Sequence, residues 1–203
     1  MTKIKICGLS RLEDIDAVNI AKPDYIGFVF AESKRQVDFE TAKRLKSKLN
    51  QEIKAVGVFV NQPVEEIISL VIEQIIDVIQ LHGDEDEEYI SKLREAVSLP
   101  IIKALRIRQK NDVKKTNADF ALFDTYDKNQ YGGSGVSFNW ELLDGYEGEF
   151  FLAGGLQSDN IEDAIKSVKP FCVDISSGVE TNGIKDQKKI LEIVEKVRRI
   201  NYE

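Results

Sequence analysis

An alternation of two kinds of segment runs along the whole chain. A short run of β-branched, aliphatic or aromatic residues is followed by a longer stretch with the spacing of a helix, and this pair recurs eight times. Such repetition is typical of strand–helix units whose strands form a parallel sheet. The predicted strands are Ile4–Gly8, Tyr25–Phe30, Lys54–Val60, Asp77–Gly83, Pro100–Ile107, Phe120–Thr125, Glu149–Gly155 and Phe171–Gly178. Their largely continuous apolar character favours strands that are buried on both faces.

Between the strands, apolar residues recur three and four positions apart, which indicates amphipathic helices. The clearest are Val64–Gln74, Glu87–Val97, Ile161–Val168 and Gln187–Ile200. The segments after the fifth and sixth strands, Lys110–Lys115 and Trp140–Leu143, predict only short helices. Several residues have the chemistry of helix caps. They are Ser10, which forms a capping-box pattern with Glu13, then Asp38, and either Ser158 or Asn160.

No Pro-rich, Ser-rich or low-complexity linker interrupts the series, so we expect one domain over residues 1–203. Eight parallel units most often close into a (β/α)8 barrel, a fold whose length begins at about 200 residues. We therefore expect an α/β fold, a TIM barrel of minimal length. An open, doubly wound sheet is the alternative, and the lack of a GxGxxG motif after the first strand argues against it.

Composition excludes several classes of function. With 35 acidic and 28 basic residues the net charge is −7, so we expect neither nucleic acid nor an anionic membrane as a partner. Two cysteines and one histidine, without a CxxC pair, predict no metal site with nitrogen or sulfur ligands. No apolar stretch approaches the roughly 18 residues of a membrane span, and a signal-peptide pattern is missing, so the cytoplasm is the expected location.

Glycine and serine at the ends of the last two predicted strands indicate a phosphate site. The seventh strand ends in Gly154-Gly155, and Ser176, Ser177 and Gly178 close the eighth. In (β/α)8 barrels these two loops commonly bind phosphate through backbone N–H groups, which glycine leaves accessible. Ordinary turn chemistry is the alternative for either motif alone.

Two strand ends carry groups suited to proton transfer. Cys7 closes the first strand just before a predicted helix start, where peptide dipoles can lower the pKa of a thiol and make it a base. An inert buried thiol is the alternative. Asp124 ends an apolar strand, where desolvation raises the pKa of a carboxyl and favours a proton donor, although a cap or ion pair is the alternative. We expect Cys172 in the barrel wall or its lower end.

Other strand ends supply candidate binding residues. Arg35 follows the second strand, and its planar fork can hold a substrate carboxylate, unless it is only a solvated loop cation. His82 ends the fourth strand; a lone histidine there is more often a hydrogen-bonded structural group than a catalyst. Asp174 lies on the same predicted rim. The segment Gly132–Gly135 lacks the P-loop pattern and predicts a flexible active-site loop or lid within residues 126–138.

Short motifs in a fixed order carry a resemblance that spans the chain. They are Lys5-Ile-Cys-Gly, Gly27-Phe-Val-Phe followed by Ser33-Lys-Arg, Gly57-Val-Phe-Val-Asn, Ile79-Gln-Leu-His-Gly, Phe123-Asp-Thr, Tyr131-Gly-Gly-Ser-Gly, Ala153-Gly-Gly-Leu and Val173-Asp-Ile-Ser-Ser-Gly-Val-Glu. In these motifs the chain resembles the phosphoribosylanthranilate isomerases of tryptophan biosynthesis. Many members of that family have proline where Lys34 stands, which changes only the expected rigidity of that loop.

The resemblance implies an Amadori rearrangement of N-(5-phosphoribosyl)anthranilate, the third step of tryptophan biosynthesis from chorismate, in a single-domain barrel without cofactor or metal. It implies that Cys7 is the general base, that Asp124 is the general acid, and that Arg35 engages the anthranilate group. The other expected substrate-binding residues are His82, Gly154, Gly155, Asp174, Ser176, Ser177 and Gly178. The expected partner is a small phosphosugar, and we expect a monomer.

Two rival functions are weighed against this one. An isomerase of histidine biosynthesis uses paired aspartates and predicts an acid where Cys7 stands. A catalytically silent barrel that binds a phosphorylated ligand predicts the loss of Cys7 or Asp124, and both are present.

Overall fold

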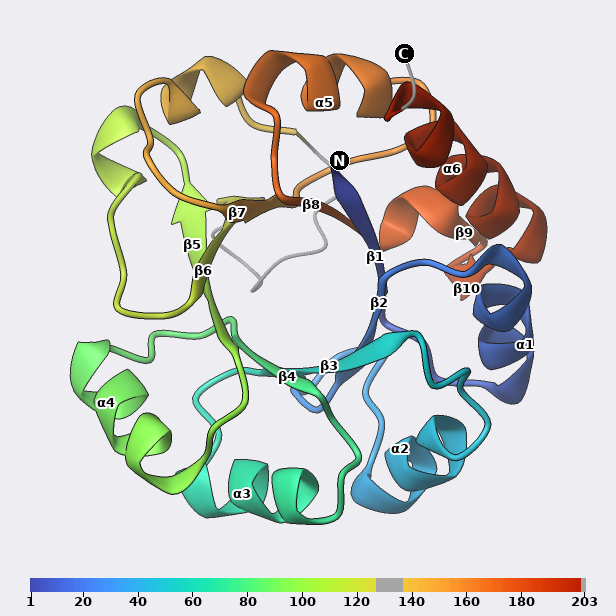
Figure 1. Ribbon diagram of the computed structural model, residues 1–203, viewed down its shortest axis with the longest axis vertical. Helices are drawn as coiled ribbons and strands as arrows, with labels where there is room; N and C mark the ends of the chain where they lie inside the picture. The colour runs from blue at the N-terminus through green and yellow to red at the C-terminus, as the bar shows by residue number, and fades with distance from the viewer. Residues whose placement is uncertain (127–136, 202–203) are drawn as a thin grey trace.

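A closed barrel of eight parallel strands forms the centre of the computed structural model, which describes residues 1–126 and 137–201 (Figure 1). The strands are β1 (Lys3–Cys7), β2 (Tyr25–Val29), β3 (Lys54–Phe59), β4 (Val78–Leu81), β5 (Ile101–Ile107), β6 (Phe120–Thr125), β7 (Phe150–Leu152) and β8 (Cys172–Ile175). They pair in chain order, and β8 pairs with β1 from Lys3↔Cys172 to Ile6↔Ile175. This closure confirms the predicted barrel and excludes the open sheet.

Helices surround the barrel in a ring (Figure 1). They are α1 (Leu12–Ala21), α2 (Phe39–Lys46), α3 (Val64–Ile72), α4 (Glu87–Ala96), α5 (Ile161–Val168) and α6 (Gln187–Ile200). After β5 and β6 the described residues form the 3-10 turns η1 (Lys110–Asp112) and η2 (Trp140–Leu143), and a third, η3 (Ser177–Val179), follows β8. No residue of η1 is buried, so a longer helix there would have no apolar face to stabilise it.

The loop after β8 holds a small antiparallel hairpin that the sequence analysis does not predict. It consists of β9 (Glu180–Thr181) and β10 (Ile184–Lys185), which pair at two positions. With only two residues in each strand, the hairpin is too short for a periodic pattern to reveal it. It carries Glu180 and Lys185 to the mouth of the barrel.

The predicted helix caps have mixed outcomes. The Ser10–Glu13 capping box is wrong, because the N-cap of α1 is Arg11, and the Asp14 carboxylate accepts from the backbone N–H groups of Ser10 and Arg11 at 3.0 and 3.1 Å. Asp38 caps α2 as predicted, accepting from the backbone N–H of Thr41 at 2.8 Å. Asn160, not Ser158, precedes α5, but its side chain does not cap the helix.

The barrel interior has an apolar layer and a polar layer, both produced by strand periodicity. Val78, Leu122 and Cys172 belong to the inner apolar cluster. Two residues further along the same strands come Gln80, Asp124 and Asp174, which line the cavity at the barrel mouth. Because side chains two apart on a strand point to the same face, one alternation places both sets inside the barrel. Cys172 lies, as predicted, in the barrel wall near the start of its strand.

The segment predicted as a lid, Gly132–Gly135, lies outside the described residues. Within residues 1–126 and 137–201, no helix is both long enough and apolar enough to cross a bilayer.

Candidate active site

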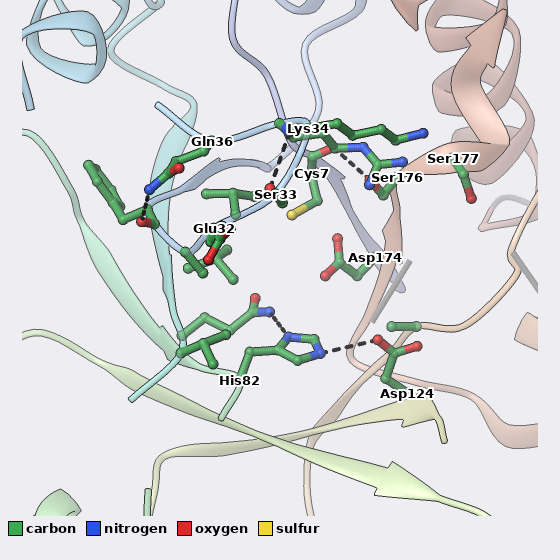
Figure 2. A pocket seen from close by; sticks show the side chains of 18 of the residues that line it. Cys7, Glu32, Ser33, Lys34, Gln36, His82, Asp124, Asp174, Ser176 and Ser177 are labelled. Atoms are coloured by element: carbon green, nitrogen blue, oxygen red, sulfur yellow. Dashed lines mark hydrogen bonds and ion pairs between the residues drawn. The ribbon is translucent and has the colours of Figure 1, made fainter. Parts of the chain in front are cut away.

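A cavity of about 910 Å³ opens at the carboxyl ends of the strands. Figure 2 shows polar side chains from several strands and loops converging on it. Its lining includes nine of the ten predicted site residues, namely Cys7, Arg35, His82, Asp124, Gly154, Gly155, Asp174, Ser176 and Ser177. The structure therefore brings together groups that are far apart in the sequence.

Gly178 is the predicted site residue that does not line the cavity. A Cβ atom at this position would lie 2.1 Å from the backbone oxygen of Leu156 and 3.1 Å from Gln157. Glycine therefore allows the loop after β8 to pack directly against the loop after β7. Gly178 brings the two loops close together, and a direct contact of Gly178 with substrate stays a prediction.

The Cys7 thiol lies inside the barrel mouth, and the residue is only 8% exposed. Its sulfur has room because the neighbouring strand carries Gly27, where a Cβ atom would lie 2.6 Å from Sγ. Burial raises the pKa of Cys7, and the positive charges of Lys5 and Lys185 only partly oppose this effect. The predicted lowering of this pKa is wrong, because the thiol is desolvated and α1 begins only at Leu12.

A chain of buried polar contacts crosses the mouth of the barrel beneath the cavity. The Lys5 ammonium donates to Asp174 Oδ2 at 2.7 Å and to Gln80 Oε1 at 2.8 Å. The Gln80 amide nitrogen lies 2.8 Å from His82 Nδ1, and His82 Nε2 lies 3.2 Å from Asp124 Oδ2. Figure 2 shows dashed lines on both sides of the His82 ring, one of them ending at Asp124. This series of contacts connects Asp174 on β8 to Asp124 on β6.

Charge attraction keeps the buried lysine of this chain protonated. Burial alone would lower the pKa of Lys5, but attraction by Asp174 and Cys7 outweighs burial, so the pKa is raised. The other oxygen of its main partner, Asp174 Oδ1, is buried and has no hydrogen-bond partner among residues 1–126 and 137–201. An unpaired carboxylate oxygen in a cavity can accept a hydrogen bond from a ligand hydroxyl.

His82 Nε2 and Asp124 Oδ2 are close without being well aligned. Their separation of 3.2 Å is within ion-pair distance, yet the ring nitrogen has no partner with hydrogen-bond geometry in the described part of the chain. The other Asp124 oxygen, Oδ1, accepts from the backbone N–H of Thr125 at 2.8 Å. Contacts in unliganded sites are often loose and tighten when substrate binds.

Arg35 makes a bidentate pair with a residue of the β9–β10 hairpin. Its Nε and one terminal nitrogen lie 2.6 and 3.0 Å from the two oxygens of Glu180. Glu180 Oε1 also accepts from Lys185 Nζ at 2.8 Å. Burial alone would raise the pKa of Glu180, but hydrogen bonds and charge attraction from Arg35 and Lys185 lower it to about 2. Arg35 is therefore an ordered cation at the cavity wall, and not a solvated loop residue.

Two glycines with left-handed backbone conformation form the rim after β7. Gly154 and Gly155 have φ values of +86° and +61°, a region that favours glycine. A Cβ atom at Gly154 would lie 2.3 Å from Thr125 Oγ1, so a side chain there would collide with the end of β6. Ser176 and Ser177 line the cavity from the loop after β8.

Among the described residues, no cluster of three or more His, Cys, Asp or Glu side chains could hold a metal ion.

The polar contacts at the barrel mouth include residues to which the sequence analysis assigns no role, namely Lys5, Gln80, Glu180 and Lys185. A signal for the first two exists, because Lys5 is two residues before Cys7 and Gln80 is two before His82 on the same strands. A polar residue two positions before an inward group also points inward. Glu180 pairs with Arg35 across 145 residues, and no local pattern reveals that contact.

Comparison with known proteins agrees with the geometry. A model of the family described as N-(5'phosphoribosyl)anthranilate (PRA) isomerase matches residues 4–196. The N-(5'-phosphoribosyl)anthranilate isomerase of Endomicrobium trichonymphae is 54% identical over 200 residues, which cover 98% of this chain and 100% of the relative.

Two solved structures are similar over nearly the whole chain. The phosphoribosyl anthranilate isomerase of Thermus thermophilus has a TM-score of 0.87 and 28% identity, covering 98% of this chain and 100% of its own. A phosphoribosyl anthranilate isomerase in complex with reduced 1-(o-carboxyphenylamino)-1-deoxyribulose 5-phosphate has a TM-score of 0.82 and 32% identity, with the same coverage. From the match to the family model and this similarity, the chain belongs to the N-(5'-phosphoribosyl)anthranilate isomerase family.

Proposed function

We propose that this protein catalyses the Amadori rearrangement of N-(5-phosphoribosyl)anthranilate to 1-(2-carboxyphenylamino)-1-deoxyribulose 5-phosphate. The observation that carries the proposal is the meeting of Cys7 and Asp124 in one cavity with the Gly154-Gly155 rim. A thiol and a carboxyl can move two protons, and the rim can hold a phosphate, so one small phosphosugar engages all three. Family membership points to the same substrate.

The first step opens the sugar ring. The Asp124 carboxyl gives its proton to the ring oxygen, and the bond from that oxygen to C1′ breaks with its electron pair going to the oxygen. The lone pair of the anthranilate nitrogen forms a C=N bond to C1′, which leaves a protonated Schiff base. Asp124 is suited to this step because it is 3% exposed, so water competes poorly for its proton.

The second step moves the double bond. The Cys7 thiolate removes the proton from C2′, and the freed electron pair forms a C1′=C2′ bond while the C=N electrons return to nitrogen. The resulting enolamine loses its O2′ proton and gains a proton at C1′, giving the ketose. The product is an isomer of the substrate, so the residues only move protons and no electron acceptor is consumed.

The remaining lining residues have proposed binding roles. Glu180 occupies two of the five N–H groups of Arg35, so the outer edge of the guanidinium remains for the anthranilate carboxylate. Gly154, Gly155, Ser176 and Ser177 surround the phosphate. The unpaired Oδ1 of Asp174 accepts a ribose hydroxyl, which would satisfy its hydrogen-bonding capacity.

Loss of phosphoribosylanthranilate fluorescence on addition of the purified protein tests the proposal. We expect multiple turnovers and a product with the mass of the substrate. Substrate binding without turnover would overturn the proposal and favour a silent phosphosugar-binding barrel. The Cys7→Ser variant is the matched control, because it keeps the cavity and removes the proposed base.

We also propose that the protein is a monomer with the phosphosugar as its small-molecule partner. Four of the large apolar side chains exposed in the described part of the chain, Leu12, Ile20, Ile72 and Ile184, come from three separate elements. So few exposed apolar residues fall short of the extended apolar patch of a stable dimer interface. Sedimentation equilibrium should give a mass near 23.0 kDa, whereas twice that mass would contradict the proposal.

A further inference from the structure

We propose that Lys5 and Gln80 are positioning residues that hold His82 in the neutral tautomer with its single proton on Nε2, the nitrogen that lies 3.2 Å from Asp124 Oδ2. The catalytic meaning of this arrangement rests on the proposed function, in which Asp124 gives a proton to the sugar ring. The state of the ring itself follows from the contacts of three buried side chains.

The first contact decides which way the Gln80 amide points. Lys5 is completely buried, and its ammonium can only donate hydrogen bonds. It lies 2.8 Å from one end of the Gln80 amide and 2.7 Å from Asp174. The amide atom that faces Lys5 must therefore be the oxygen, since an NH2 group there would oppose a buried cation.

The second contact decides which ring nitrogen carries the proton. With the Gln80 oxygen on Lys5, the amide NH2 faces His82 Nδ1 at 2.8 Å. An NH2 group donates, so Nδ1 must offer its lone pair, and the proton of the neutral ring is on Nε2. A second proton on Nδ1 would set two donors against each other where Gln80 is only 1% exposed. The amide thus opposes formation of the imidazolium.

The third contact gives the ring state its consequence. Nε2 lies 3.2 Å from Asp124 Oδ2, while Oδ1 is bonded to the Thr125 N–H. A neutral ring offers this carboxyl only a dipole. An imidazolium would place a full positive charge there and stabilise the carboxylate over the acid. By keeping His82 neutral, Gln80 preserves the ability of Asp124 to give up a proton to the substrate.

Other ionisable groups around the ring do not supply such a charge directly. Lys5 and Cys7 come from β1, Asp174 from β8, and Lys103 from β5. Lys103 is paired with Glu85 at 2.8 Å in the loop after β4 and also donates to the Gly83 oxygen. Lys5 is likewise paired with Asp174. Asp124 is the carboxylate within ion-pair distance of the His82 ring among the described residues.

The single histidine of the chain makes the ring state directly measurable. Nitrogen-15 NMR of the whole protein without substrate should show one pair of imidazole signals, with Nε2 protonated and Nδ1 unprotonated. A proton on Nδ1, or an imidazolium at neutral pH, would overturn the proposal.

Two variants test whether Gln80 sets this state. In Gln80→Glu, a carboxylate oxygen accepts from Nδ1, so the ring should become an imidazolium at neutral pH. In Gln80→Met neither contact remains, and we expect a mixture of the two neutral tautomers. Gln51→Glu is the matched control, because it adds the same charge at an exposed loop position and should leave the ring unchanged. An unchanged ring in both Gln80 variants would contradict the proposal.

Kinetics then test the link to Asp124. Gln80→Glu should lower kcat by about ten-fold or more, with a smaller effect on KM, because the lost step is proton donation and not binding. Circular dichroism and the NMR spectrum report whether the variant is folded, and Gln80→Met provides a neutral substitution. If the wild-type ring has the expected state but the protein does not turn over phosphoribosylanthranilate, the proposed function fails while the positioning stands. If Gln80→Glu has an imidazolium and still has the wild-type kcat, the charge state of His82 does not affect proton donation by Asp124.

Discussion

The two groups proposed for proton transfer, Cys7 and Asp124, each lie at the end of a strand and are both buried, yet their neighbours differ. Cys7 shares its surroundings with charges, namely Lys5, Asp174 and Lys185. Asp124 faces His82 Nε2 at 3.2 Å, and its Oδ1 accepts from the backbone N–H of Thr125. The two lysines favour the ionised thiol and Asp174 opposes it, whereas of the two neighbours of Asp124 only the Thr125 N–H donates with hydrogen-bond geometry. The two strand ends therefore offer different surroundings to the proposed base and the proposed acid.

The largest expected effect comes from removing either group. Cys7→Ser and Asp124→Asn should each lower kcat by about 10²- to 10⁴-fold, since each removes one proton-transfer step. Steady-state assays measure the loss, and circular dichroism checks that the barrel remains folded. Cys172→Ala, which removes the other thiol from the apolar layer, should retain the wild-type kcat. Near wild-type turnover in Cys7→Ser or Asp124→Asn would contradict the role of that residue.

A substitution of Lys5 tests how much the charges around Cys7 contribute to stability. Lys5→Met leaves Asp174 buried without its partner, and breaking a buried ion pair in this way costs about 3 to 5 kcal/mol of the free energy of unfolding. Urea denaturation measures this loss. The exposed pair Lys43–Glu73 is the control, because solvent screens this pair and Lys43→Met should cost far less. Equal losses of unfolding free energy in the two variants would show that the buried Lys5–Asp174 pair has no special importance for stability.

Glu180→Gln removes the charge that orders Arg35 at the cavity wall. Losing one charge-assisted partner should raise KM by about ten-fold, with a smaller change in kcat, because Arg35 is proposed to bind and not to transfer protons. Substrate titration separates the two constants. Arg35→Lys should give a similar rise in KM, since an ammonium cannot form the bidentate pair. A fall in kcat alone would contradict this assignment.

The same ion pair predicts a pH dependence of stability. The pKa of Glu180 is about 2 in the folded protein, below the usual 4.5, so its ionised form stabilises the fold above about pH 4.5. That contribution is lost as the pH falls from about 4.5 to about 2. The difference in urea midpoint between wild type and Glu180→Gln should therefore shrink over this range. A constant difference would contradict the charge-based explanation.

The smallest expected effect concerns the ionisation of the Cys7 thiol. Because burial raises the pKa of Cys7, the thiolate is a minor species at neutral pH. The rate of alkylation by iodoacetamide at Cys7, followed by peptide mass spectrometry, should keep rising with pH above 9. Lys185→Met should move this rise to still higher pH, since the Lys185 charge favours the thiolate. A plateau near neutral pH would mean that Cys7 is ionised there.

Much of this molecule is readable from local patterns. The strand–helix alternation predicts the closed barrel, and spacing by two along each strand places Cys7, His82, Asp124 and Asp174 in one mouth. The same rule, applied to Lys5 and Gln80, reveals the buried polar chain. These features are readable because periodicity is a property of adjacent residues.

Barrel closure decided which distant residues meet and how deeply they are buried. Lys5 meets Asp174 across 169 residues and Arg35 meets Glu180 across 145, and these contacts exist only when the strands and loops have come together. Closure also explains why the pKa of Cys7 is raised and not lowered, since burial outweighs the attraction of the lysines beside the thiol. The sequence by itself determined which residues face inward. The tertiary structure decided their partners, burial and charge states, because electrostatic energies depend on distances and solvent access that no local pattern contains.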